Sequence, residues 1–150
     1  SALPTDAAQV LQRIADDEQG HADLIAAIQA ELPAAQTSIS PLRLAQFFRR
    51  IEAATPAEHL ARVAALDWAV CKLLQPLLRI GGPVSQAPLL HSAMCGLRQD
   101  EARHVRLARS LAQQMGFSAT LQTTLNLDMQ QRLQRLMQPV HAALQRLRGQ

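Results

Sequence analysis

Two short segments of the chain place a glutamate three residues before a histidine, a spacing that suits metal binding. They read DDEQGH and DEARHV and give the pairs Glu18 with His21 and Glu101 with His104. Residues three apart on a helix project from the same face, so both side chains of a pair can reach one ion. Carboxylate and imidazole together suit iron and other transition metals. The sequence therefore offers two metal-binding pairs.

Both pairs lie within the apolar stripe of a predicted helix rather than beside it. The stripe of the first helix continues on both sides of its pair, through Leu11, Ile14, Ile25, Ile28 and Leu32. Glu101 and His104 interrupt a later stripe in the same way, and Asp67 falls in the stripe of an intervening helix. Buried carboxylates without partners cost several kcal/mol each, and no Lys or Arg lies in the middle of these stripes. A divalent or trivalent cation would balance the three carboxylates, so we expect a metal between them.

Helix start and stop signals divide the chain into five predicted helices with short connections. Their expected ranges are about 5–32, 41–54, 56–80, 85–115 and 118–148. Ser40-Pro41 and the segment TPAE (Thr55 to Glu58) each place a capping hydroxyl before a proline, and Gly116 suits a helix end. We find no alternating apolar pattern typical of strands. The sequence predicts one all-α domain over residues 1–150, an antiparallel bundle of four long helices and one short helix.

The two inward Glu-x-x-His pairs on long helices resemble the ferritin-like di-iron carboxylate superfamily, and DEARHV is similar to the final ligand helix of those proteins. The resemblance covers roughly residues 5–115. It implies that Glu18 and His21 hold one ion, that Glu101 and His104 hold the other, and that Asp67 is a terminal carboxylate. It also implies that the cofactor is a pair of iron ions, with manganese as the alternative.

Two departures from that pattern leave the fourth carboxylate of the site open. Asp67 is one methylene shorter than the glutamate usual in the family, and only Ser1 to Thr5 precede the first Glu-x-x-His helix. The chain could lack an N-terminal helix that carries the missing ligand. Alternatively, the last helix could supply Asp128, or water or a second subunit could complete the site.

The resemblance favours an oxidase or oxygenase that activates dioxygen or peroxide, with an unknown substrate and electron donor. Iron oxidation and storage is an alternative, although the chain has few acidic residues away from the stripes. A metal-free helical module that binds another protein, with a ferritin-like core, is the third hypothesis. Whether the protein is an enzyme therefore stays open, and a homodimer is compatible with each reading.

Charge and hydropathy narrow the location and the partners of the protein. The 150 residues carry a net charge of +3, and no basic run is longer than Arg49-Arg50. This argues against nucleic acid, and the arginines at positions 98, 103, 106 and 109 are expected to form a solvated face. With no apolar run long enough to span a membrane and no signal peptide, we expect a cytoplasmic protein. Cys71 and Cys95 are expected to be free thiols.

The second ring nitrogen of a metal-binding histidine needs a partner that fixes the tautomer. Asp17, Asp23 and Asp100 are close enough in sequence to serve. Asp17 and Asp100 each directly precede a motif glutamate, a position that also suits a side chain facing solvent. The sequence does not decide between these roles.

Overall fold

The computed structural model describes residues 4–33 and 37–150, and all regular secondary structure in these residues is helical. The α-helices are α1 (Ala7–Glu31), α2 (Pro41–Arg49), α3 (Pro56–Leu74), α4 (Pro88–Gln114), α5 (Ala119–Leu136) and α6 (His141–Arg148). Two 3₁₀ turns, Pro83–Gln86 and Gln138–Val140, precede α4 and α6. The prediction of an all-α fold is confirmed.

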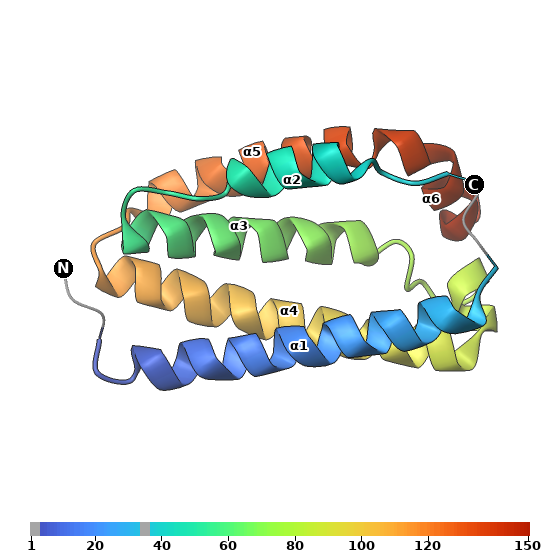
Figure 1. Cartoon of the computed structure of the whole chain (residues 1–150), viewed down its shortest axis with the longest axis horizontal. Helices are drawn as coiled ribbons and strands as arrows, with labels where there is room; N and C mark the ends of the chain where they lie inside the picture. Colours follow the sequence, from blue (N-terminus) through green and yellow to red (C-terminus); the bar gives the residue numbers. More distant parts are fainter. Residues whose placement is uncertain (1–3, 34–36) are drawn as a thin grey trace.

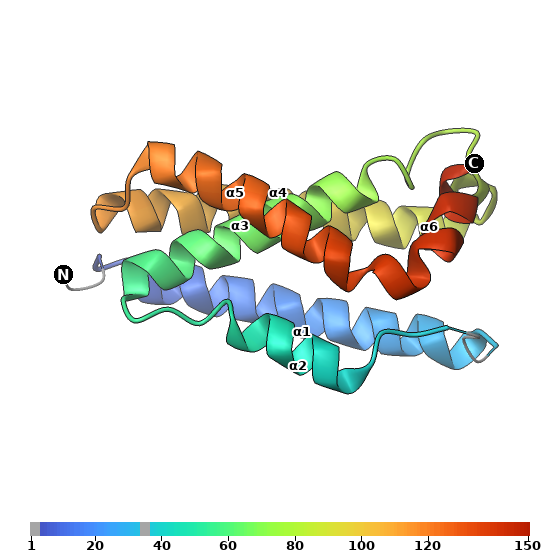
Figure 2. The ribbon, with the colours of Figure 1, turned by 90° about the horizontal axis from the view of Figure 1, so that it is seen from above.

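Successive helices from α1 to α5 reverse direction along an elongated bundle (Figure 1). α3 lies at the centre and packs extensively against both α4 and α5, whereas α1 packs against α4 and α2 against α5. Seen from above, α1 and α2 occupy one side of the molecule, and α4 and α5 occupy the other (Figure 2). α1, α3 and α4, the helices that carry the predicted ligands, therefore share one part of the bundle.

Three helices begin where the sequence supplies a capping hydroxyl. The side chains of Ser40, Thr55 and Ser118 accept hydrogen bonds from the backbone N–H three residues later, at 3.2, 3.2 and 3.4 Å. Each bond satisfies a donor that the first turn of a helix leaves free. Gly116 follows α4 with a φ of +93°, a left-handed conformation that favours glycine. These start and stop signals were readable from the sequence alone.

Proline shortens two of the predicted helices. The third was expected to reach residue 80, but α3 ends at Leu74 because Pro76 has no N–H and its ring clashes with the preceding turn. The last predicted helix is broken near Pro139 into α5 and α6 for the same reason. The second helix also ends early, at Arg49. The prediction of four long helices and one short helix is therefore wrong in detail.

Alanine lines much of the face that α3 presents to its neighbours. Ala61, Ala64, Ala65 and Ala69 are at most 1% exposed. Because the distance between packed helices depends on the side chains at the contact, these small residues let α3 lie close to α4 and α5. Larger side chains complete the buried core, namely Leu60, Leu111, Met129, Leu133 and Leu136.

The second half of α1 is less covered than the sequence predicted. Ile25 and Leu32 belong to the expected apolar stripe, yet they are 44% and 58% exposed. α4 is the main neighbour of α1, so a single flank of the helix is covered. Ala7 and His21 are its buried residues. The middle of α1 is thus held against the bundle by a polar contact rather than by an apolar one.

The cysteine prediction is confirmed, because Cys71 and Cys95 are both free and half-buried. Among the described residues, no helix combines the length and the apolarity needed to cross a membrane.

Candidate metal centre

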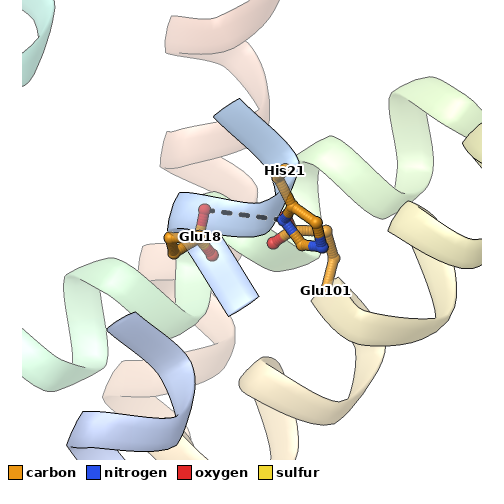
Figure 3. Close-up of side chains that lie close together, drawn as sticks. All are labelled: Glu18, His21 and Glu101. Carbon is orange, nitrogen blue, oxygen red and sulfur yellow. Dashed lines mark ion pairs between the residues drawn. The ribbon is translucent and has the colours of Figure 1, made fainter. Parts of the chain in front are cut away.

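The five predicted ligands come together from three helices. α1 contributes Glu18 and His21, α3 contributes Asp67, and α4 contributes Glu101 and His104. They form two groups in which the potential ligand atoms all lie within 4.8 Å of one another: Glu18, His21 and Glu101, and Asp67, Glu101 and His104. Figure 3 shows the first group, with the Glu101 carboxylate beside the ring of His21. Glu101 belongs to both groups, so it lies where it could bridge two ions.

Four of the five side chains are buried, and Glu18 is not. His104 is fully buried, and Glu101, Asp67 and His21 are 6%, 8% and 8% exposed. The side chain of Glu18 is 49% exposed, which corrects the expectation that it lies within the seam. The physical reason is the sparse packing of α1, whose flank away from α4 faces solvent. The site is therefore closed on the side of α3 and α4 and open at Glu18.

The aspartates that precede the two glutamates bind the histidines crosswise between α1 and α4. His21 Nε2 lies 3.0 Å from Asp100 Oδ2, and His104 Nε2 lies 3.0 Å from Asp17 Oδ2. Each carboxylate accepts a hydrogen bond from the histidine of the other motif, which requires the proton on Nε2. Asp23, the third candidate, instead accepts a hydrogen bond from Gln19 at the surface. The structure therefore shows which aspartates are the partners of the histidines, a choice that the sequence left open.

Arg103 ties the two aspartates together, a role that the sequence did not reveal. Its Nη2 atom lies 2.7 Å from Asp17 Oδ2 and 2.8 Å from Asp100 Oδ1. The side chain of Arg103 is 41% exposed, so it lies at the surface as expected, but it also forms these two ion pairs. Its position three residues after Asp100 was the available signal, because side chains at that spacing are neighbours on a helix.

The remaining nitrogen of each imidazole faces the carboxylates and has no hydrogen bond. The Nδ1 atoms of His21 and His104 are buried, and neither has a hydrogen-bond partner among the described residues. Carboxylate oxygens nevertheless lie close: Glu101 Oε1 is 3.3 Å from His21 Nδ1, and Glu18 Oε1 is 3.0 Å from His104 Nδ1. In a neutral ring with its proton on Nε2, the Nδ1 atom of each histidine directs a lone pair toward negative oxygens. A cation between these atoms would turn that repulsion into attraction.

Burial and mutual repulsion raise the pKa of the inner carboxyl groups. Burial raises the pKa of Asp67 to about 8, with help from the charges of Glu101 and Glu18. Burial and the charge of Glu18 also raise the pKa of Glu101, although the charges of His104 and His21 and a hydrogen bond from Asp67 oppose this. In the metal-free chain, Asp67 therefore keeps its proton near neutral pH and donates a hydrogen bond to Glu101.

The pKa values of His21 and Asp17, which lie at the edge of the site, are shifted by their hydrogen-bond partners and by nearby charges. Burial acts to lower the pKa of His21, but the hydrogen bond to Asp100 and the charges of Glu101 and Glu18 outweigh it, so that pKa is raised. Hydrogen bonds from His104 and Arg103 lower the pKa of Asp17. Asp17 therefore stays ionised and can hold the proton on His104 Nε2.

Asp128 is not part of the site. Its Oδ2 atom pairs with Arg132 Nε at 2.8 Å on the exposed side of α5, and α5 packs on α3 away from α1. The alternative in which the last helix supplies the fourth carboxylate is therefore wrong. Among the described residues, the groups of potential metal ligands comprise the five predicted residues alone.

Comparisons of the chain with protein-family models, with curated proteins and with solved structures found no match in any of the three. The geometry and chemistry of the site are therefore the basis for assigning a function.

Proposed function

We propose that this protein is a dinuclear metal carboxylate protein that binds two iron ions and uses them to activate dioxygen or peroxide. One observation carries the proposal: the buried Nδ1 atoms of the two histidines lie near the carboxylates of Glu18 and Glu101, while each Nε2 atom is hydrogen-bonded to an aspartate. This is the arrangement of a histidine that is ready to bind a metal, because the partner of one nitrogen fixes the tautomer that leaves the other free.

The ligand set fits two ions that share Glu101. Glu18 and His21 would hold one ion, as expected from the sequence, and His104 with Asp67 would hold the other. When Asp67 has lost its proton and both histidines are neutral, the site has a formal charge of −4, from five carboxylates and one guanidinium. These groups belong to Asp17, Glu18, Asp67, Asp100, Glu101 and Arg103. Two divalent cations balance that charge, which supports a dinuclear rather than a mononuclear centre.

Iron is favoured over calcium or magnesium because two imidazoles accompany the carboxylates, and manganese remains the alternative metal. A bound pair of reduced iron ions would supply electrons to dioxygen or peroxide. The protein orients the imidazoles through Asp17 and Asp100 and excludes water on the side of α3 and α4. The exposed Glu18 leaves one side through which a small oxidant can approach.

Metal titration tests the proposal directly. Anaerobic addition of Fe²⁺ to the chelator-treated chain should saturate at two ions per chain, and His21→Ala with His104→Ala should remove this binding. His59→Ala with His141→Ala is the matched control, because both residues are exposed and lie outside the site. Circular dichroism checks that each variant is folded. Full iron binding by the first variant would show that the ligand assignment is wrong.

The reaction with oxygen separates the remaining hypotheses. Admission of dioxygen to the iron-loaded chain should consume it, with an optical change that is absent from the double histidine variant. Iron storage would instead accumulate many more than two ions per chain in a large assembly that gel filtration detects. A metal-free interaction module would bind none.

A further inference from the structure

A second, unassigned site lies on the opposite part of the bundle, where arginines from α2 and α5 converge. A hollow of about 240 Å³ between these helices is bordered by Arg43, Arg50, Arg132 and Arg135. No carboxylate is among its lining residues. This cluster could not be predicted from the sequence, because its arginines are separated by up to 92 positions.

The guanidinium groups of this arginine cluster retain charge that the protein does not neutralise. Among the described residues, no ion pair involves Arg43, Arg50 or Arg135. Arg43 Nη2 donates a hydrogen bond to the carbonyl oxygen of Arg135 at 3.0 Å, which holds the Arg43 guanidinium at the hollow. Arg132 is paired with Asp128 through Nε alone. Four guanidinium groups therefore border a small space, and guanidinium groups bind oxyanions through charge-assisted hydrogen bonds.

An apolar hollow adjoins the arginine cluster. It measures about 600 Å³ and shares Arg50, Met129 and Arg132 with the first hollow. Its walls include Phe117 and Leu121, and Leu121 is 57% exposed. An apolar wall beside a cationic pocket fits a ligand that is charged at one end and apolar at the other.

Glu58 and Asp128, the carboxylates that line the apolar hollow, are each paired with an arginine. Glu52 lines a neighbouring hollow together with Arg50 and Arg135 but makes no ion pair among the described residues. Glu58 Oε1 pairs with Arg62 Nη2 at 2.6 Å, and Asp128 pairs with Arg132. Arg62 also donates hydrogen bonds to the backbone oxygens of Arg50 and Glu52, so its guanidinium is held at the turn after α2. Among the described residues, the side chains of Arg50 and Arg135 make neither an ion pair nor a hydrogen bond, and Arg43 uses Nη2 alone.

We propose that the two adjoining hollows form one groove that binds a small amphipathic anion. The phosphate or carboxylate head group would lie in the arginine cluster, and the apolar chain would lie along Phe117 and Leu121. Charge complementarity selects the head group, and the adjoining apolar wall selects the chain. None of the groove residues belongs to the candidate metal centre, so the inference does not depend on the proposed function.

Calorimetric titration with octyl phosphate tests the groove. One molecule should bind per chain, and Arg50→Gln with Arg135→Gln should weaken binding about tenfold or more, because charge-assisted hydrogen bonds are lost. Neither side chain makes a hydrogen bond within the described protein, so the variant should fold. Arg106→Gln with Arg109→Gln, on exposed positions of α4, removes the same charge and should leave the affinity unchanged.

Further ligands resolve which part of the anion is recognised. Comparing the affinity for octanoate with the affinity for octyl phosphate identifies the preferred head group. Leu121→Ser should weaken the binding of octyl phosphate but not that of inorganic phosphate. The unaltered chain should bind inorganic phosphate less tightly than octyl phosphate. The proposal is overturned if octyl phosphate does not saturate, if octanol binds equally well, or if both arginine variants behave alike. Tighter binding of a short single-stranded oligonucleotide, lost in Arg50→Gln with Arg135→Gln, would also overturn it.

Discussion

His104 Nε2 lies 3.0 Å from Oδ2 of Asp17, a residue 87 positions earlier in the chain. His21 has the same relationship with Asp100, so the two Asp-Glu-x-x-His segments hold each other across the contact between α1 and α4. Each segment supplies a potential ligand pair and also the residue that orients the histidine of the other segment. This reciprocity makes the aspartates as informative about the site as the glutamates.

Removing one of these carboxylates should weaken metal binding without removing a ligand. Asp100→Asn should lower metal affinity by about 10- to 100-fold, because the amide no longer stabilises the proton on His21 Nε2. Equilibrium dialysis with Mn²⁺, which does not react with oxygen as Fe²⁺ does, measures this change.

Asp23→Asn is the control for that experiment, since Asp23 also lies on α1 but bonds only to Gln19 at the surface. If both variants bound Mn²⁺ as the unaltered chain does, Asp100 would have no positioning role.

Metal uptake should release protons, and affinity should rise with pH. The raised pKa of Asp67, about 8, means that its proton must leave before the carboxylate can bind a cation. The pKa of His21 is raised as well, by Asp100, Glu101 and Glu18 against the effect of burial. We expect about one to two protons released per chain at pH 7. Calorimetry of Mn²⁺ binding in buffers of different ionisation enthalpy counts them, and an identical heat in every buffer would contradict the prediction.

Without metal, the buried Asp67 should make the fold less stable as pH rises. The folded chain keeps a proton that the unfolded chain releases above the ordinary pKa of 3.8, so stability falls between about pH 4 and pH 8. Asp67→Asn removes the free-energy cost of ionising a buried carboxyl group at this position. At pH 8 it should stabilise the metal-free chain by on the order of 2 kcal/mol, which raises Tm by about 4 to 8 °C.

Thermal unfolding at pH 4 and pH 8 measures this effect, and the advantage of Asp67→Asn should shrink at the lower pH. Asp128→Asn is a matched control, because Asp128 is half-exposed and paired at the surface. An equal gain at both pH values would indicate a cause other than ionisation of Asp67.

Added metal should reverse this instability in the unaltered chain. A ligand that binds only the folded state stabilises it by about 2.7 kcal/mol at one hundred times its Kd. Tm should therefore rise with Mn²⁺ concentration in the unaltered chain but stay constant in His21→Ala with His104→Ala. A similar rise in both proteins would mean that Mn²⁺ binds elsewhere.

The helical class, several helix ends and the five candidate ligands could be predicted from the sequence alone. Capping hydroxyls such as Thr55 act on backbone donors three residues away, and the Glu-x-x-His spacing fixes a shared helix face, so both are local properties. Prolines at positions 76 and 139 are local too, and their effect on the two helices could have been read from the sequence.

Features that depend on how separate helices pack could be seen only in the tertiary structure. The stripe of α1 could not reveal that one flank would stay open and leave Glu18 half-exposed, because exposure depends on which neighbours cover a helix. The crossed bonds of Asp17 and Asp100, the bridging role of Arg103 and the arginines between α2 and α5 join residues far apart in the chain. Periodicity tells which residues share a face of one helix, whereas only packing brings the faces of different helices together.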